Sequence, residues 1–463
     1  MINRNSSVKK IIFICALLDL FLLFYLPLNG NERDWVIWII VYITGLLVEV
    51  MFFVGGCRYN IDIFEPVLLI SIVYFAFLIF APIRCIYFKS YDCLGVDVMN
   101  GAVGGTIVFG ISMLCYYLGY WNKFRIAEYA FVKEKALDSS DYISEQRIAF
   151  VALIIWVVCC GLTLLYDFSV GRTLIYMFSF GKINTSLGEL RETGGNINLL
   201  INFEYSMIGA WMYLFRYSRI KCVKAITFVL TLSLLFVRGF RFIILIFVLA
   251  PIIYTYMRKD KRPAFTSLLL FAIVAILAFS MIETVRNSVR SGDGYHYEIT
   301  SVLYAFNRVF DSDFTVFKPF YGIIEHFPKD MPFQYGKEML LYTFVMIIPR
   351  VIWPGKPDAL QKMVVTTAVS ETAAQSGMAF VNLGEFYFEF GILGCIVSMF
   401  LFGVLSRYLR RIAKINSDGL ICYSMLLPTC IQLVARGYIP SNFYLIVFLC
   451  LPTLIIRFIA KRI

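Results

Sequence analysis

The chain has 463 residues, of which 60% are hydrophobic and only 16% are charged, and its mean hydropathy is +0.76. A soluble protein of this length exposes far more polar surface, so the composition excludes a soluble globular fold. The formal net charge of +11 is therefore interpreted through membrane topology, and it does not indicate nucleic acid as a partner.

Apolar runs recur along the whole chain at lengths close to the ~20 residues that a membrane-spanning helix needs. Helices are the expected spanning elements, because in lipid each backbone polar group must be satisfied within its own segment. The sequence thus predicts an all-α integral membrane protein with about twelve transmembrane helices. The expected spans are 10–28, 35–54, 64–82, 100–120, 148–167, 197–215, 222–237, 240–257, 264–284, 388–406, 419–435 and 441–458.

This pattern divides the chain into four parts. The first part is a four-span bundle, and the second is a five-span region that contains the turn "VRGFR". A long loop segment follows, and the last part has three spans. The four parts are 1–147, 148–284, 285–387 and 388–463.

The charges between the spans predict the orientation of the chain. The clusters "RYSRIKCVK", "RKDKR" and "RYLRRIAK" adjoin span ends, where an excess of Lys and Arg marks the cytoplasmic side. Alternation from a cytoplasmic N-terminus puts all three clusters inside. We therefore expect both termini in the cytoplasm, and the turn "VRGFR" and residues 285–387 on the outer face.

The outer segment 285–387 is rich in aromatic residues and contains a short apolar run, "MLLYTFVMII", at 339–348. This run is too short to cross a bilayer and is followed by "PRVIWPGKP". We expect a re-entrant or interfacial helix that ends at Pro349, with Trp353 at the depth of the lipid headgroups. A loop of this length usually carries function, and it is predicted to cover the outer face of the bundle.

Cationic side chains follow several of the expected outer helix ends. Arg238 and Arg241 are three residues apart, and they share a face at a helix N-terminus if Gly239 opens the eighth span. The arginine fork fits phosphate oxygens and stays charged at any working pH. Converging on one pocket, these cations would bind a di-anion such as a lipid-linked pyrophosphate; attraction to anionic headgroups or isolated salt bridges is the alternative. The other candidates are Arg286, Arg290, Arg350, Lys356 and Arg436.

Candidate acid–base groups also fall in or beside the outer segment. The two histidines of the chain, His296 and His326, both lie there, and histidine titrates near neutrality. Glu385, in "GMAFVNLGEFYFEFG", lies at the outer mouth of the tenth span, where partial burial among aromatics would tune a carboxylate. A capping role or an ion pair with an arginine is the alternative for Glu385. Asp311 and Asp313 form a DxD pair, but such pairs are common in turns and no metal site is predicted.

Motifs for other chemistries are absent from the sequence. It contains no P-loop, GxSxG, HExxH or CxxC, so ATP hydrolysis, serine hydrolysis and zinc chemistry have no support. No cofactor is predicted.

Five motifs in a fixed order resemble a known family. They are "VRGFR" between two spans, "ETVRNSVRSGDG" after the next span, "IIPRVIWPGKP", "GMAFVNLGEFYFEFGILG" leading into a span, and "RGYIPSN". With about twelve spans and one long outer loop, the chain resembles the Wzy-type O-antigen and capsule polymerases of bacterial cytoplasmic membranes over residues 150–445. The first four spans are similar only in hydropathy.

The resemblance implies a GT-C-like, metal-independent glycosyltransferase that takes undecaprenyl-pyrophosphate-linked glycans as donor and acceptor. It also implies contact with membrane lipid, and a chain-length regulator and a flippase as partners. It would assign pyrophosphate binding to Arg238, Arg241, Arg286, Arg290 and Arg350. Related ligases use an outer-loop histidine as the base, which leaves His326 and Glu385 both open for that role.

Proteins of a different class could share several of these features. A transporter or flippase for the same lipid-linked sugar would also need cationic residues, but in a central cavity between two repeats. We find no internal repeat, and the outer arginines gather on one side, which favours an enzyme. The sequence is also compatible with a related O-antigen ligase, a membrane acyltransferase or a non-catalytic adaptor.

Overall fold

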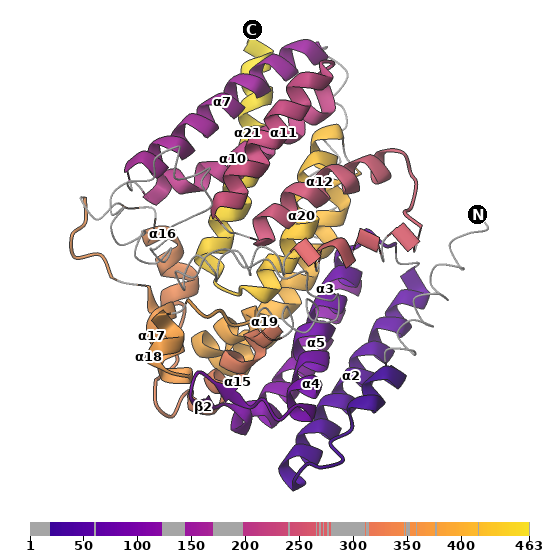
Figure 1. Cartoon of the computed structure of the whole chain (residues 1–463), viewed down its shortest axis with the longest axis vertical. Helices are drawn as coiled ribbons and strands as arrows, with labels where there is room; N and C mark the ends of the chain where they lie inside the picture. Colours follow the sequence, from indigo (N-terminus) through magenta and orange to yellow (C-terminus); the bar gives the residue numbers. More distant parts are fainter. Residues whose placement is uncertain are drawn as a thin grey trace, which may run out of the picture.

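In the computed structural model, the described part of the chain is mainly helical (Figure 1). The residues that it describes are 19–59, 62–122, 144–169, 198–238, 241–264, 266–267, 270–271, 273–275, 277–278, 311, 314–346, 348, 352–357, 359–375, 377–414 and 416–462. Among these residues, eight helices are long and apolar enough to cross a membrane. The chain is a multi-pass membrane protein, as predicted. The eight helices are Glu32–Gly55, Pro66–Tyr87, Met99–Trp121, Glu145–Ser169, Arg241–Arg258, Asn382–Ile412, Ser417–Ala435 and Ile439–Arg462.

Four of the twelve expected spans are not among these eight helices. Helix α10, Phe203–Tyr217, has only 15 residues, and α11, Lys221–Arg238, contains three cationic residues; neither is among the eight. The expected spans 10–28 and 264–284 are described only in part, because residues 10–18 and several residues of 264–284 lie outside the described residues. The total of twelve therefore stays a prediction.

The first group of helices contains α2 (Glu32–Tyr59), α3 (Pro66–Phe75), α4 (Ala81–Tyr87), α5 (Ala102–Trp121) and α19 (Asn382–Ile412). A π-helical stretch, Ala76–Phe80, joins α3 to α4. Helices α5 and α19 approach closely because glycines lie at their crossing. A Cβ on Gly119 would be 2.1 Å from the Phe400 carbonyl oxygen, and one on Gly403 would be 2.2 Å from that of Tyr116. Both positions therefore require a residue without a side chain.

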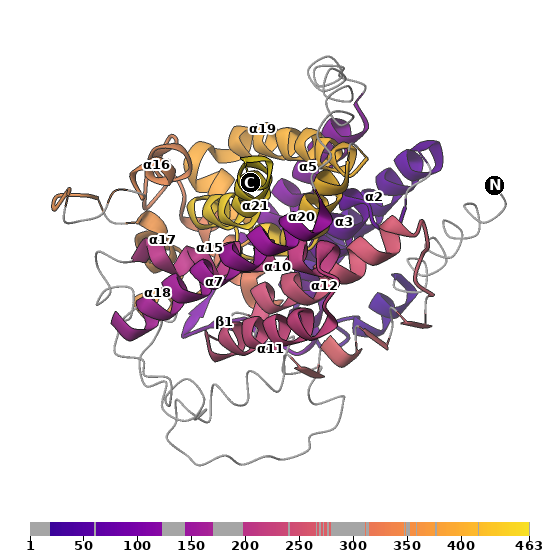
Figure 2. The ribbon, with the colours of Figure 1, turned by 90° about the horizontal axis from the view of Figure 1, so that it is seen from above.

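The second group contains α7 (Glu145–Ser169), α10, α11, α12 (Arg241–Arg258) and α21 (Ile439–Arg462). Figure 2 shows these helices beside the first group. Trp211 of α10 lies in their core, with its ring centroid 4.9 Å from that of Phe247. Helix α20 (Ser417–Ala435) joins the two groups, because its Ile421 packs into this core and its Val434 packs into the core of the first group.

The segment predicted as a long outer loop is folded where it is described. It contains α15 (Phe317–His326), the π-helical segment η7 (Lys337–Tyr342), α16 (Thr343–Val345), α17 (Leu360–Ala368) and α18 (Glu371–Gln375). A hairpin of β1 (Asp92–Cys93) and β2 (Val96–Asp97) lies at the same end of the molecule (Figure 1). Lys318 of α15 donates to the carbonyl oxygens of Ser90 and Asp92, both at 2.7 Å. This bond network fixes the hairpin to α15.

The short apolar run is helical only in part, as η7 and α16. Three of its apolar side chains are exposed, Leu340 at 55%, Leu341 at 61% and Phe344 at 66%. Exposed apolar side chains are expected in a membrane-contacting segment. Its position relative to the bilayer stays a prediction.

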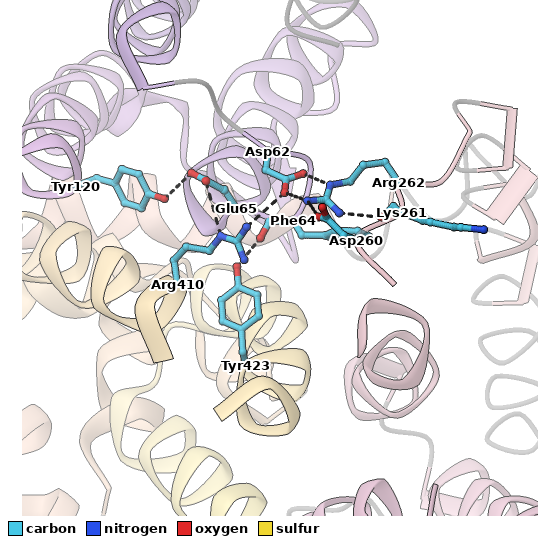
Figure 3. A network of polar contacts seen from close by, with 9 residues as sticks. All are labelled: Asp62, Phe64, Glu65, Tyr120, Asp260, Lys261, Arg262, Arg410 and Tyr423. Atoms are coloured by element: carbon cyan, nitrogen blue, oxygen red, sulfur yellow. Dashed lines mark hydrogen bonds and ion pairs between the residues drawn. The ribbon is translucent and has the colours of Figure 1, made fainter. Parts of the chain in front are cut away.

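The opposite end of the first group carries a cluster of paired charges (Figure 3). Asp62 forms ion pairs with Arg262 and, at 3.3 Å, with Arg410. Arg410 also approaches Glu65 at 3.7 Å. We call Asp62, Glu65, Arg262 and Arg410 the charge-paired cluster. Its members come from the segments between spans 2 and 3, 8 and 9, and 10 and 11, which the alternation places on one side of the membrane.

Candidate active site

Three glutamates are buried near the start of α19, at the end of the molecule that carries α15 and the hairpin. Glu385 and Glu389 are one turn apart on α19 and both are 0% exposed. Glu338, in η7, is 1% exposed, and its backbone N–H donates to Glu389 at 2.9 Å. We call these three residues the carboxyl cluster. Burying acidic groups is costly unless they are hydrogen-bonded or protonated.

Glu385 lies in the first turn of α19, which begins at Asn382. Its Oε2 accepts a 2.6 Å hydrogen bond from the backbone N–H of Ile439, the first residue of α21. Its Oε1 is buried and has no hydrogen-bond partner among the described residues. The side chain of Glu385 is completely buried, whereas the sequence predicted partial burial, because α15 and the start of α21 pack against this turn of α19.

Glu338 is bonded through both carboxyl oxygens. Oε1 accepts from the Tyr438 hydroxyl at 2.5 Å, and Oε2 accepts from the Leu360 N–H at 3.1 Å. Burial raises the pKa of Glu338, and the hydrogen bonds from Tyr438 and Leu360 oppose that rise. Burial and the nearby Glu338 carboxyl also raise the pKa of Tyr438. For Glu338, burial thus outweighs the two hydrogen bonds in the direction of its pKa shift.

Two of the predicted cations are connected to this cluster through the link that precedes α21. Arg241 is the first residue of α12 and is 6% exposed. The guanidinium of Arg436, at the C-cap of α20, lies 5.8 Å from the ring centroid of Phe242, so Arg436 and the start of α12 meet. The short link 436–439 then leads to Tyr438 and to Ile439, which contact Glu338 and Glu385. The fold thus brings together residues from four distant parts of the chain.

The other predicted cations are distributed differently. Arg238 is the last residue of α11 while Arg241 begins α12. Whether they share one helix face was expected to depend on Gly239, which lies outside the described residues, so that expectation stays a prediction. Lys356 donates to the carbonyl oxygens of Met346 and Ile348, both at 3.0 Å, and so closes its own loop. Arg286, Arg290 and Arg350 lie outside the described residues, as do His296 and Asp313.

His326 is the last residue of α15, and its side chain is 31% exposed. Its Nδ1 lies 2.5 Å from Oδ2 of Asp330. A carboxylate at Nδ1 holds the ring in one orientation and leaves Nε2 to exchange a proton. Helix α15 packs against the start of α19, since Ile323 lies against Gly384. Asp311 forms an ion pair with Arg84.

Sequence reasoning missed Glu338, Glu389 and Tyr438. One signal was present: Glu389 follows Glu385 by four residues, which places the two carboxyl groups on one helix face. Glu338 gave no such signal, because it lies in a short segment whose partner Tyr438 is 100 residues away. Only the tertiary structure joins them.

The fold and this site define a class: a multi-pass helical membrane protein with three buried carboxyl groups at one end of the bundle, bonded to a link that carries an arginine. A family model described as O-antigen polysaccharide polymerase Wzy matches residues 11–463, and the chain belongs to this family. It is similar to O-antigen polymerases of Salmonella typhimurium and Salmonella typhi, each 24% identical over 232 residues. These matches cover 48% of this chain and 51% of each relative, so the chain spans about half the length of the curated relatives it matches. No solved structure matches it.

Proposed function

We propose that this protein is a polysaccharide polymerase that joins undecaprenyl-pyrophosphate-linked oligosaccharide repeat units on the outer face of the bacterial cytoplasmic membrane. The observation that carries the proposal is its membership of the Wzy family over nearly the whole chain. The position of Arg436 supports it, because the link that carries this residue also bonds to Glu338 and Glu385. Membership of this family favours a polymerase over the three alternatives of a transporter, a ligase and an acyltransferase.

The proposed reaction needs two kinds of group. An acceptor hydroxyl oxygen bonds to the anomeric carbon of the donor sugar, and the bond from that carbon to the pyrophosphate oxygen breaks with its electron pair. Because the lipid pyrophosphate is already a good leaving group, the reaction needs no ATP, and we propose that arginines rather than a metal ion stabilise its charge. Arg241 and Arg436 are the described candidates, with Arg238, Arg286, Arg290, Arg350 and Lys356 completing the predicted set.

A base must accept the proton of the acceptor hydroxyl group. Glu385 and His326 remain the two candidates, and their surroundings differ. Glu385 is fully buried, so as a base it requires the link 436–439 to move away from it. His326 is partly exposed and oriented by Asp330, so it reaches an acceptor without such a movement. We retain Glu385 as the first candidate because its Oε1 is buried and has no hydrogen-bond partner in the described part of the chain.

We also propose a placement in the membrane. Both termini are cytoplasmic, and α15, α17 and α18 face the outer compartment in a GT-C-like arrangement of the four predicted parts. The exposed Leu340, Leu341 and Phe344 lie at the membrane interface, where the lipid part of the substrate enters. A chain-length regulator and a flippase are the proposed partners in the cell.

Deleting the gene and analysing the lipid-linked glycans tests the function. We expect single repeat units on the lipid carrier at the outer leaflet and no long polymer, with polymer restored by a plasmid copy. Single units confined to the cytoplasmic leaflet would indicate a flippase instead. Long polymer that stays on the lipid carrier would indicate a ligase.

A further inference from the structure

Helix α19 is interrupted just after the carboxyl cluster. Phe390 (φ −135°, ψ 15°) and Gly391 (φ 63°, ψ −152°) have non-helical backbones, and the positive φ of Gly391 favours glycine. The interruption frees backbone carbonyl groups of the turn before it. The oxygens of Phe388 and Glu389 accept instead from the N–H groups of Gln334 and Tyr335, at 3.0 and 2.9 Å. The segment 334–339 is thus bonded to the broken helix.

The Glu389 side chain adds three more bonds to the same segment. Its Oε2 accepts from the N–H of Gly336 at 2.5 Å, and its Oε1 accepts from those of Glu338 and Met339 at 2.9 Å each. These N–H groups stand at the N-terminal end of η7, where helical donors have no partner of their own. A carboxylate in this position satisfies them and complements the positive end of the helical segment.

The contacts continue from this segment to the candidate active site. The bonds of Glu389 fix the backbone of Glu338, whose carboxyl group accepts from Tyr438 at 2.5 Å. Tyr438 lies in the link 436–439, which carries Arg436 and the N–H group that bonds to Glu385 at 2.6 Å. One buried carboxylate, Glu389, is therefore connected through two hydrogen-bonded steps to a candidate base and a candidate phosphate-binding cation.

We propose that Glu389 is a positioning residue of the polymerase, which holds segment 334–339 and, through Glu338 and Tyr438, sets the place of the link 436–439. The inference rests on the proposed function. In the described part of the chain, the three side-chain hydrogen bonds of Glu389 go to backbone N–H groups, so the proposed role requires no contact with the substrate. Replacement of Glu389 should therefore lower the turnover rate more than it lowers the affinity for the lipid-linked donor.

The test uses Glu389→Gln in the full-length protein purified in detergent. Glutamine keeps the size of the side chain but replaces one acceptor oxygen by an NH₂ group that faces an N–H. Amide hydrogen exchange at 336–339 should rise, because these bonds weaken. Loss of a charge-assisted hydrogen bond corresponds to a fall in kcat of about 10–100-fold, with KM for the donor within about twofold of wild type.

Three further variants sharpen the test. Glu371→Gln is the matched control, since Glu371 is an exposed acid in the first turn of α18, bonded only to Gln375 in the described contacts; it should change neither measurement. Tyr438→Phe removes only the hydroxyl bond to Glu338, so kcat should fall while exchange at 336–339 stays at the wild-type rate. If Glu389→Gln does not fold, Glu389→Asp, which keeps the charge on a shorter side chain, should show the same pattern in a weaker form.

Unchanged exchange at 336–339 in a folded Glu389→Gln variant would overturn the inference. Faster exchange with a wild-type kcat would also overturn it, because Glu389 would then be only a helix cap. If the wild-type protein makes no polymer in the assay, the proposed function fails and the functional half of this inference fails with it. The exchange data would still decide whether Glu389 holds the segment.

Discussion

The acidic side chains at the two ends of the helical bundle have different kinds of partner. In the charge-paired cluster, Asp62 is shared by Arg262 and Arg410 (Figure 3). In the carboxyl cluster, the described contacts of Glu338, Glu385 and Glu389 are with backbone N–H groups and one tyrosine hydroxyl, and none of the three has a cation partner in the described part of the chain.

This difference indicates where chemistry can occur. Paired charges neutralise one another and tie the loops between helices together, and they have no capacity left for a substrate. Carboxyl groups held by neutral donors in a buried site keep the ability to gain and lose protons. Arg436 is connected to this second end through the link 436–439, so the site that we propose combines an anion-binding group with a proton-accepting group.

The largest expected effect is a difference in cysteine labelling between the two ends of the bundle, which shows which end faces the outer compartment. In a background without native cysteines, Lys329→Cys should react with an impermeant maleimide in intact spheroplasts, and Lys261→Cys should react only after lysis. Both lysines are exposed. Labelling in the reverse order would place the carboxyl cluster on the cytoplasmic side and exclude the proposed orientation.

The second-largest effect is expected when Arg241, a residue proposed to bind the anionic donor, is replaced. Arg241→Ala should lower polymer formation by about 10²–10³-fold, the usual loss when one donor to a developing charge is removed. Arg241→Lys keeps the charge but loses the planar fork, so its activity should be intermediate. Arg33→Ala is the control, because Arg33 forms a half-exposed pair with Asp97 near the hairpin. Full-length polymer from an Arg241→Ala protein at normal membrane levels would exclude a role in binding the donor.

A smaller effect is expected at the charge-paired cluster. Asp62→Ala leaves Arg262 and Arg410 without their shared carboxylate, which should lower the free energy of unfolding by about 1–3 kcal/mol. The apparent melting temperature in detergent should fall while kcat at a permissive temperature stays unchanged. A fall in kcat without a change in melting temperature would remove the distinction between the two ends.

The smallest effect is a pH dependence of stability. Because the pKa of Glu338 is raised in the folded protein, the folded state holds its proton more tightly than the unfolded state does. Its contribution to stability is full below the ordinary value of 4.5 and is lost as pH rises through the raised pKa. Glu338→Gln, which has no proton to lose, should show a smaller decline in melting temperature over this window. An identical decline in both proteins would assign the dependence to other groups.

Hydropathy predicted most of the fold because a membrane span needs a long apolar run, which is visible locally. Hydropathy is less informative about the length and the ends of helices that are buried by protein. Helix α10, with 15 residues, shows that a helix buried inside the bundle need not have the length of a span. Helix α19 begins six residues before its expected start, because its polar first turn is buried by protein rather than by lipid.

The sequence identified single candidate residues of the site, but it did not predict which residues lie together. Glu385, Arg241 and Arg436 were identified from their positions at helix ends, a property of the local sequence. Their meeting, and the bonds from Glu389 to the segment 334–339, depend on the interruption at Gly391 and on contacts between segments far apart in the chain. No periodicity in the sequence encodes such contacts.

The most direct measurement of the central claim is the turnover of purified protein with a synthetic lipid-linked repeat unit, with and without a chelator. Glu385→Gln removes the ionisable group at nearly constant size and should lower turnover by about 10²–10⁴-fold, while Asp62→Ala stays near wild type. A near-normal Glu385→Gln beside an inactive His326→Asn would assign the base to His326. Wild-type turnover in both variants would contradict the claim that this end of the bundle performs the chemistry.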